Sequence, residues 1–374
     1  MSTNPTIGIL GGGQLALMMS EAARSLGLAT EILASRRDDP VFQIAPQALI
    51  GDPYDIDDLR RIAGRCDVIT FDHENVDPVT LKILEDEGVL LRPGSKSLTF
   101  AVDKSCQLQL FRDLQLPVPD TTVVHEVDAA IEAMARFGPK CVLKTATGGY
   151  DGKGVLLTGD PQTVRSWYPT HQTSVLVQKN LEFDCEFAVQ IVRAVNGEIV
   201  AYPPVRTTQL DGMCTSVEVP SGIGAALESS AQEIAGKIAE AIDVIGLLAV
   251  EFFVVNGELV LNEIAARPHN SGHVTMESSF TSQFENHMRA VAGLPLGSTA
   301  LVVPAAVMVN LVGTDSGVLH TDLVPDDVAV HLYGKTPRLG RKLGHVTAIA
   351  ETVELAKIKA LQTAKAIHYG EEIR

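Results

Sequence analysis

Short apolar strands alternate with helical segments over the first hundred residues, and this alternation constrains the fold more than any other feature of the sequence. The strand-like runs are TIGIL, ATEILA, QALIG and DVITF, and helices are predicted at about 14–26 and 55–65. Consecutive strands that are separated by helices pair in parallel with right-handed crossovers. The N-terminal part is therefore predicted to be an α/β domain built on a parallel sheet.

A second α/β region is predicted after the Pro- and Gly-containing segment LRPGSKS at 91–97, which we interpret as a domain boundary. Asp128 is expected to be the N-cap of a helix that runs to Arg136. The run KCVLKTA is predicted to be a strand, with partner strands at 155–158 and 174–178.

The last third of the chain combines a hairpin with a small strand-rich end. After a helix predicted at about 229–245, the apolar runs LLAVEFFVV and ELVLNEIAA flank Asn256-Gly257, a dipeptide typical of two-residue hairpin turns. Short strands are expected from about residue 301, followed by a helix at about 354–367. The 374 residues exceed the roughly 250–300 at which single cores stop growing, so several domains are expected.

Composition and charge narrow the class of function. Hydrophobic residues make up 45% and charged residues 20% of the chain, a balance typical of soluble globular proteins. The net charge of −16 repels phosphate backbones, so we expect small-molecule substrates and no nucleic-acid partner. Five widely spaced cysteines without a C-x-x-C pair indicate reduced thiols, and no apolar run reaches the ~18 residues of a membrane span. We therefore expect a cytoplasmic protein without membrane association.

The run GGGQLA at 11–16 follows a strand and opens a helix, which places N–H groups where a phosphate can bind. It fits the G-x-G-x-x-A pattern of dinucleotide-binding folds. That pattern also needs an acidic residue at the end of the second strand, where this chain has Ala34-Ser35-Arg36, with Glu31 near the strand start. A dinucleotide is disfavoured, and the alternatives are a phosphate-bearing substrate or a purely structural turn.

A second glycine-rich run, TGGYDGKG at 147–154, follows a strand that carries Lys144 and includes Lys153. Four glycines let the backbone lie against an anion, which the two ammonium groups can neutralise. The run lacks the G-x-x-x-x-G-K-[ST] pattern of a Walker A loop. An ordinary hairpin loop is the alternative.

Glu251 and Glu263 lie on two strongly apolar strands, where an unpaired carboxylate is costly to bury. Together with Asn262 they offer the oxygen ligands that Mg²⁺ prefers, although exposed strand positions are an alternative. A regular two-residue turn at Asn256-Gly257 would pair Glu251 with Asn262 and send Glu263 to the opposite face. Convergence of the two carboxylates therefore requires an odd loop or a β-bulge.

Two further runs gather donors for anions. ARPHNSGHVT at 266–275 contains Arg267, whose guanidinium suits a carboxylate or phosphate; metal binding by His269 and His273 is the weaker alternative. GKTPRLGRKLGH at 334–345 concentrates cations in an acidic chain, and its alternative is a solvated basic loop. We expect this second run to fold back against Gly11–Leu15.

Taken together, GGGQL, the ENV of DHENV, TGGYDGKG, NEIAARPHNSGH and GRKLGH resemble the ATP-grasp superfamily, and within it the 5-(carboxyamino)imidazole ribonucleotide synthases. The resemblance spans nearly the full chain. It implies an α/β fold with an N-terminal parallel-sheet domain at 1–97, a two-lobed ATP-grasp domain at 98–300 with its lid lobe at about 120–178, and a small β-rich C-terminal domain at 301–374. A homodimer is usual in the family.

The resemblance also implies a reaction. ATP phosphorylates bicarbonate to carboxyphosphate, which yields carbon dioxide for the exocyclic amine of 5-aminoimidazole ribonucleotide. Arg267 and Lys342 are the implied catalytic residues, and Glu251 and Glu263 the implied Mg²⁺ ligands. The implied ATP-binding residues are Lys104, Lys144, Gly149, Tyr150, Asp151, Gly152, Lys153, Gly154, Gln178, Lys179, Glu186, Gln209, Asn262 and Glu263. The implied ribonucleotide-binding residues are Gly13, Gln14, Leu15, Glu74, Asn75, His269, Asn270, Ser271, Lys335 and Arg341.

The chain departs from the family pattern at Ala16-Leu17, at FDHENV, at VRTTQ and at Gln178-Lys179, where an acidic residue is common. Gln178 can still donate to and accept from an adenine edge. Two other functions are considered: an ATP-grasp ligase or transformylase with a different acceptor, and a nucleotide-binding regulator without catalysis. Glu251, Glu263 and Arg267 argue against the regulator, because they supply the groups that phosphoryl transfer needs.

Overall fold

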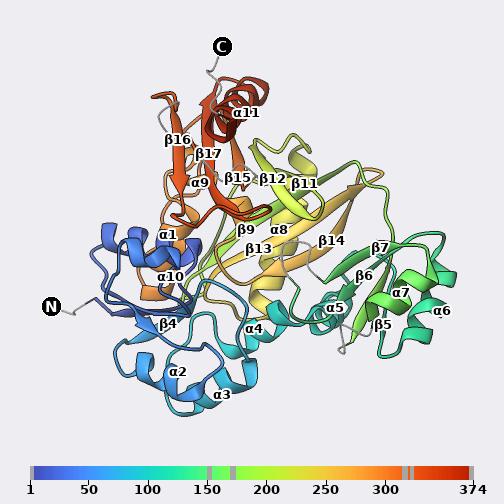
Figure 1. The fold of residues 1–374 in the computed structure, drawn as a ribbon, viewed down its shortest axis with the longest axis horizontal. Coiled ribbons are helices and arrows are strands. Elements are labelled where there is room, and N and C mark those ends of the chain that lie inside the picture. The colour runs from blue at the N-terminus through green and yellow to red at the C-terminus, as the bar shows by residue number, and fades with distance from the viewer. Residues whose placement is uncertain (1–3, 150–153, 169–173, 314–318, 321–323, 370–374) are drawn as a thin grey trace.

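The computed structural model describes residues 4–149, 154–168, 174–313, 319–320 and 324–369 (Figure 1). Its N-terminal part is a four-stranded parallel sheet in the order β3-β2-β1-β4, which confirms the predicted α/β domain. The elements of this part are β1 (Ile7–Leu10), α1 (Gln14–Ser25), β2 (Thr30–Ala34), a 3-10 turn (Pro40–Gln43), β3 (Leu49–Ile50), α2 (Ile56–Ala63), β4 (Val68–Phe71) and α3 (Pro78–Asp86).

The lid lobe is a separate antiparallel sheet in the order β5-β8-β6-β7. It comprises β5 (Thr121–Val124), α6 (Val127–Phe137), β6 (Cys141–Thr145), β7 (Val155–Thr158), α7 (Pro161–Trp167) and β8 (Val175–Lys179). The predicted pairing of β6 with both partner strands is confirmed. Helices α6 and α7 pack their apolar faces against this sheet around Ala130 and Val164.

The predicted N-cap at Asp128 is wrong. Helix α6 begins at Val127 after Glu126, which has extended backbone and makes no side-chain cap, and Asp128 lies in the first turn, 2.7 Å from Arg165. Aspartate is favoured both as N-cap and in the first turn, where the helix dipole attracts negative charge. The residue type alone therefore could not fix the helix start.

A nine-stranded sheet forms the centre of the molecule and runs in the order β14-β13-β9-β11-β12-β15-β17-β16, with β10 paired to β9. Its strands are β9 (Cys185–Arg193), β10 (Ile199–Ala201), β11 (Val205–Leu210), β12 (Met213–Val219), β13 (Gly246–Val255), β14 (Glu258–Ala265), β15 (Ala305–Val312), β16 (Val328–Leu332) and β17 (Lys342–Ala350). The C-terminal strands therefore extend the ATP-grasp sheet through the β12–β15 pair, a continuity that the sequence did not predict.

Helices connect this sheet to the other parts. They are α4 (Ser95–Val102), α5 (Lys104–Asp113), α8 (Ala225–Ala241), α9 (Thr275–Ser278), α10 (Gln283–Ala292) and α11 (Val353–Tyr369), with a 3-10 turn at Asn270–Gly272. Helix α8 starts and ends four residues before the predicted 229–245, because the chain turns at Asp243, whose φ is 56°. No helix among the described residues is long and apolar enough to cross a membrane.

Helix α10 joins the N-terminal domain to the large sheet, and it lies beside α1 in Figure 1. Phe284, Met288 and Val291 enter the same apolar cluster as α1. On the other side of the helix, the buried His287 accepts a hydrogen bond from the Leu247 N–H at 3.1 Å and contacts Thr70 Oγ1 at 2.8 Å. Burial lowers the pKa of His287 to about 3, so its ring is neutral and Nε2–H donates to Thr70.

We predict that Gly246→Ala destabilises the protein more than Gly197→Ala does. Gly246 has a φ of 112°, and a Cβ there would lie 2.9 Å from the His287 ring, whereas at Gly197, with a φ of 87°, nothing lies within 4 Å. Backbone strain alone costs about 1–2 kcal/mol in either variant, and overpacking against His287 adds about 1–3 kcal/mol at Gly246. Urea denaturation measures both losses; equal losses would contradict the role given to His287.

Candidate functional site

A bulged hairpin brings the two candidate metal carboxylates together. Val255 pairs with Glu258 across a two-residue turn at Asn256-Gly257, as predicted, but the register shifts between Glu251 and Phe252. Glu251 is therefore opposite Glu263, and Asn262 is the extra residue of a bulge. The predicted bulge is confirmed, and both carboxylates belong to the same face of the sheet.

Two lysines from other elements reach these carboxylates. Lys104 Nζ, at the start of α5, donates to Glu263 Oε2 at 2.6 Å. Lys144 Nζ, on β6 of the lid lobe, donates to Asn262 Oδ1 at 2.9 Å, and Asn262 Nδ2 donates to Glu251 Oε2 at 3.2 Å. The bulge residue thus links the lid lobe to the metal candidates.

The two carboxylates have different pKa values, because burial, like charge and the lysines act on them to different extents. Burial and the neighbouring Glu263 raise the pKa of Glu251, whereas Lys104 and Lys144 outweigh burial and lower the pKa of Glu263. Burial lowers the pKa of Lys144, although Glu263 opposes that shift. A divalent cation would balance the pair, and Mg²⁺ is normally bound by one or two carboxylates plus phosphate oxygens.

A pocket opens between α5 and the lid lobe, next to this hairpin. Gln178, the candidate adenine partner, lines it together with Lys104, Gln107, Leu108, Phe111, Val118, Pro119, Thr121, Lys144, Leu176, Leu261 and Asn262. Lys179 instead is exposed on the lid lobe, 3.9 Å from Asp120. The pocket is lined by apolar side chains together with several amide and ammonium groups, a combination that suits a nucleotide base.

The other candidate ATP-binding residues that the structure describes do not line this pocket. Glu186 is half-buried on β9, and burial raises its pKa to about 7, an effect that Lys144 opposes. Gln209 lies at a bulge of β11, opposite Cys214, and does not line the pocket. Gly149 and Gly154 flank the glycine-rich loop, and Tyr150, Asp151, Gly152 and Lys153 lie outside the described residues.

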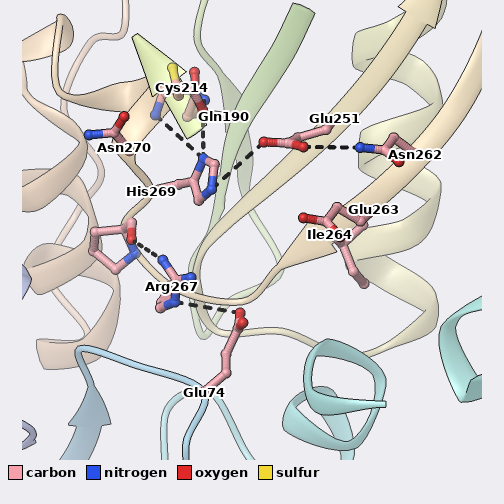
Figure 2. Close-up of polar contacts among 12 residues, drawn as sticks. Glu74, Gln190, Cys214, Glu251, Asn262, Glu263, Ile264, Arg267, His269 and Asn270 are labelled. Atoms are coloured by element: carbon pink, nitrogen blue, oxygen red, sulfur yellow. Dashed lines mark hydrogen bonds and ion pairs between the residues drawn. The ribbon is translucent and has the colours of Figure 1, made fainter. Parts of the chain in front are cut away.

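The loop after β14 carries the candidate catalytic arginine (Figure 2). Arg267 Nη1 donates to the Pro268 carbonyl at 3.1 Å, and its buried Nε lies 3.6 Å from Glu74 Oε1 without a hydrogen-bond partner. Glu74 also accepts from the Ala266 N–H at 3.2 Å. These contacts bring the DHENV segment and the loop of Arg267 together. Asn75, the next residue after Glu74, is exposed.

His269 faces the metal candidates from the same loop. Its Nδ1 accepts from the Ser271 N–H at 3.4 Å and contacts Ser271 Oγ at 2.7 Å, so the neutral ring carries its hydrogen on Nε2. Nε2 lies 3.8 Å from Glu251 Oε1. Figure 2 marks this contact with a dashed line. Asn270 forms two hydrogen bonds with Asn310, at 3.0 and 2.7 Å.

The alternative of a metal site at His269 and His273 is not supported. His273 is fully buried, its Nδ1 is 2.9 Å from Gln283 Nε2, and burial lowers its pKa well below the usual value. Among the described residues there is no group of three or more His, Cys, Asp or Glu side chains that could hold a metal ion. Glu251 and Glu263 therefore remain the candidate pair.

At the far end of the site the predicted contact between GKTPRLGRKLGH and the first glycine-rich run is present. Lys335 Nζ donates to Gln14 Oε1 at 2.5 Å, and Gln43 Nε2 donates to the Tyr333 carbonyl at 2.9 Å. Arg341 Nη1 donates to the Thr336 carbonyl, and burial with the nearby Arg338 lowers its pKa. Lys335 of this run thus contacts the start of α1, while Arg341 interacts electrostatically with Asp38 and Asp39 of the neighbouring loop.

The backbone N–H groups at the start of α1 are not all available to a ligand, although the sequence had suggested that they were. The Gly13 N–H, which we expected to be available to a phosphate, donates to the buried Asp72 at 2.6 Å. Leu15 packs its side chain into the N-terminal core, which leaves only its backbone for a ligand. Lys342 is buried as the first residue of β17, opposite Val312, and not in an open loop.

Several polar residues at the site were missed by sequence analysis. Gln190 Nε2 donates to Ser271 Oγ at 2.7 Å, and Gln283 contacts the backbone of His269. A glutamine inside the apolar strand EFAVQIVR was a usable signal for Gln190, since buried polar groups need partners. Asp72 is the first residue of the DHENV segment and could have been noticed there. Gln283 and Asn310 could not be recognised from the sequence, because their hydrogen-bond partners are distant in the chain.

Comparisons with known proteins agree with this architecture. Residues 109–284 match the ATP-grasp domain model, residues 4–102 the ribonucleotide synthetase preATP-grasp domain, and residues 306–359 the phosphoribosylaminoimidazole carboxylase C-terminal domain. The chain is 39% identical to the N5-carboxyaminoimidazole ribonucleotide synthase of Mycobacterium leprae, over 91% of this chain and 83% of that protein. It is 38% identical to the Synechococcus elongatus protein of the same name, over 91% of this chain and 88% of that protein.

Solved structures show the same likeness over almost the whole chain. An N5-carboxyaminoimidazole ribonucleotide synthetase in complex with ADP superposes with a TM-score of 0.90 at 34% identity, covering 97% of both chains. The Aspergillus clavatus N5-carboxyaminoimidazole synthase, solved with ADP and 5-aminoimidazole ribonucleotide, superposes with a TM-score of 0.89 at 28% identity. That match covers 98% of this chain and 100% of the other. The predicted three-part fold is confirmed.

We predict that Lys104→Met lowers the free energy of unfolding, because it leaves Glu263 next to Glu251 without its closest cation. The expected loss is about 1–3 kcal/mol, less than for a fully buried pair because the Glu263 side chain is 35% exposed. Adding Glu263→Gln should recover most of this loss, since it removes the unpaired charge.

The matched control is Lys82→Met, which removes a lysine from an exposed pair with Asp86 and should cost less than about 0.5 kcal/mol. Chemical denaturation of the wild type, Lys104→Met, Glu263→Gln and the double variant measures the coupling, with Lys82→Met as the control. Additive losses for Lys104→Met and Glu263→Gln would show that the two side chains do not depend on each other.

Proposed function

The chain belongs to the N5-carboxyaminoimidazole ribonucleotide synthase family, and from this we infer that it carboxylates 5-aminoimidazole ribonucleotide at the expense of ATP in purine biosynthesis. It is an ATP-dependent ligase. The observation that carries this function is the convergence of Lys104 and Lys144 on the bulged hairpin, next to the loop of Arg267 and His269. This convergence supports the proposal because it brings two lysines and the two candidate metal carboxylates close to the loop of an arginine.

We propose that the nucleotide binds between α5 and the lid lobe. Lys104 and Lys144 would neutralise phosphates, Gln178 would hydrogen-bond the adenine edge, and Glu186 would hold the ribose. Glycines of the 148–154 loop would let its backbone close over the phosphates. Asn262 and Glu263 lie where the phosphates would meet the metal, while Lys179 and Gln209 would contribute from the rim.

Mg²⁺ would be held by Glu251 and Glu263, which fit it because they are adjacent, largely buried carboxylates of unequal pKa. The ion would supply charge neutralisation at the transferred phosphoryl group. Its binding would keep Glu251 ionised despite burial. Lys104, now paired with Glu263, would be freed to contact phosphate oxygens.

Bicarbonate is the proposed co-substrate, phosphorylated to carboxyphosphate, whose breakdown delivers carbon dioxide to the exocyclic amine. The amine forms the new N–C bond and loses one proton. Arg267 would stabilise the charge that develops on carboxyphosphate, since its guanidinium is largely buried in the loop directly after the strand of Glu263 and electrostatic stabilisation is commonly the largest catalytic effect. Lys342 would contribute a second positive charge from the start of β17.

The ribonucleotide would lie between the start of α1 and the loop of Arg267. Its phosphate would meet the backbone N–H groups of Gln14 and Leu15 together with Lys335 and Arg341, because helix-start N–H groups supply only about half a positive charge. Gly13, whose N–H is bound to Asp72, would leave space for the phosphate to approach without donating to it. The base would meet residues near the reacting carbon, namely Glu74, Asn75, His269, Asn270 and Ser271.

Three properties of the whole chain complete the proposal. We propose a homodimer, as is usual in the family, and a cytoplasmic location, which agrees with free thiols at all five cysteines. The domain limits are proposed at 97/98 and 300/301. The first limit falls within the first turn of α4 (Ser95–Val102), and the second precedes β15.

We predict that ADP forms rapidly only when Mg²⁺, bicarbonate and 5-aminoimidazole ribonucleotide are all present. Each is needed because the metal completes the phosphate site, bicarbonate accepts the phosphoryl group and the ribonucleotide consumes the product. A coupled ADP assay with single omissions and a chelator arm measures this. Equal ADP formation without the ribonucleotide, or product with formate in place of bicarbonate, would assign the site to another acceptor.

We also predict that Arg341→Ala or Lys342→Ala raises the KM for the ribonucleotide by about tenfold or more, because a charge-assisted hydrogen bond is worth about 1.5–3 kcal/mol. The KM for ATP should stay within about twofold. Lys237→Ala, which removes the same charge from the exposed face of α8, is the control and should change neither constant. A ribonucleotide KM that stays flat in both site variants would make this segment a solvated surface feature.

A further inference from the structure

Gln283 is the first residue of α10, and its side chain is fully buried against the loop of His269. Its Oε1 accepts a hydrogen bond from the His269 N–H at 3.0 Å. Its Nε2 donates to the His269 carbonyl at 2.7 Å. One side chain thus binds both backbone polar groups of a residue that faces the carboxylate pair, as a neighbouring strand would.

The orientation of this amide is fixed by its partners. A backbone N–H can only donate and a carbonyl can only accept, so the oxygen of Gln283 must face the His269 nitrogen. The amide nitrogen then has a second hydrogen, which reaches His273 Nδ1 at 2.9 Å. His273 therefore accepts at Nδ1, and flipping the amide would break both contacts with the His269 backbone.

The surrounding loop is built around the same amide. The Gln283 N–H donates to Thr275 Oγ1 at 2.9 Å, and that hydroxyl donates to the Gly272 carbonyl at 2.6 Å. A Cβ at Gly272 would lie 2.3 Å from Gln283 Oε1. Glycine at this position leaves the space that the amide occupies, so Gly272 and Gln283 fit only as a pair.

The effect of this arrangement reaches the imidazole of His269. Because the His269 N–H and carbonyl are both hydrogen-bonded to Gln283, the backbone from which the ring extends is held in place. Ser271 then orients the ring by donating to Nδ1. Nε2–H is thereby aimed toward Glu251, 3.8 Å away. Gln190 donates to Ser271 Oγ and so holds the hydroxyl that contacts Nδ1.

We propose that Gln283 is a positioning residue, which holds the backbone of His269 so that its imidazole faces the reacting end of the ribonucleotide. The proposal rests on the function proposed above, in which His269 contacts that substrate. Gln283 itself touches neither substrate nor metal candidate among the contacts described. Its contribution passes through His269, so it should vanish when the imidazole is absent.

The test is a double-mutant cycle between Gln283→Leu and His269→Ala. In the wild-type background we expect Gln283→Leu to lower kcat/KM for the ribonucleotide by roughly 10–100-fold, the usual cost of removing a residue that orients a site ligand. The KM for ATP should change by less than about twofold. In the His269→Ala background the same substitution should cost less than about twofold. Equal losses in both backgrounds would overturn the proposal.

Two further variants separate positioning from stability. Gly272→Ala keeps the amide but displaces it, so it should reproduce the kinetic loss even where Gln283→Leu folds poorly. Ser282→Ala removes the N-cap of the same helix, where Ser282 accepts from the Glu285 N–H at 3.2 Å, and should lower stability without changing kcat/KM. A kinetic loss with Ser282→Ala as large as that with Gln283→Leu would also overturn the proposal.

Failure of the proposed function is distinguishable from failure of this inference. Wild-type protein that forms no ADP in response to the ribonucleotide would refute the function alone. Crystal structures of the wild type and Gln283→Leu then still test the role of Gln283. The inference predicts a displaced His269 ring in the variant, and an unchanged ring would contradict it.

Discussion

The site depends on one irregularity, the bulge that places Glu263 opposite Glu251. Without it, Asn262 would occupy that position and the two carboxylates would face opposite sides of the sheet. Every other part of the site is arranged around this pair. Helix α5 supplies Lys104, the lid lobe supplies Lys144, and the chain that leaves β14 turns at once into the loop of Arg267. Two adjacent carboxylates that are largely buried lower the stability of the fold unless cations compensate their charge. The pair that the bulge creates therefore depends on the two lysines.

The three domains are held together by side chains that cross between them. Tyr333, from the C-terminal domain, is buried in the apolar cluster of the N-terminal domain, and its carbonyl accepts from Gln43. Lys335 continues this contact at Gln14, while α10 packs against α1 and β13. The ribonucleotide site proposed above lies where the N-terminal domain, the loop of Arg267 and the C-terminal domain meet. Substrate binding at such a junction depends on domain placement as much as on individual side chains.

Sequence patterns predicted the features whose causes are local. The parallel sheet, the hairpin turn at Asn256-Gly257 and the lid-lobe strands followed from periodicity and turn chemistry. The bulge was also predictable, because two isolated carboxylates on apolar strands required it. The start of α6 was misassigned, since aspartate favours two neighbouring positions. Gln283 and the β12–β15 pairing were not predictable, because they depend on contacts between segments that are distant in the sequence.

The central claim is that Glu251 and Glu263 together hold the divalent cation that accompanies the nucleotide. Anomalous diffraction from crystals of the protein with ADP and Mn²⁺ tests it directly, because Mn²⁺ prefers the same carboxylate oxygens as Mg²⁺ and can be located by its scattering. The account predicts a manganese ion within coordination distance of an oxygen from both carboxylates, with Lys104 moved from Glu263 toward the phosphates. A manganese ion bound by only one of the two carboxylates, or bound elsewhere with Lys104 still on Glu263, would contradict it.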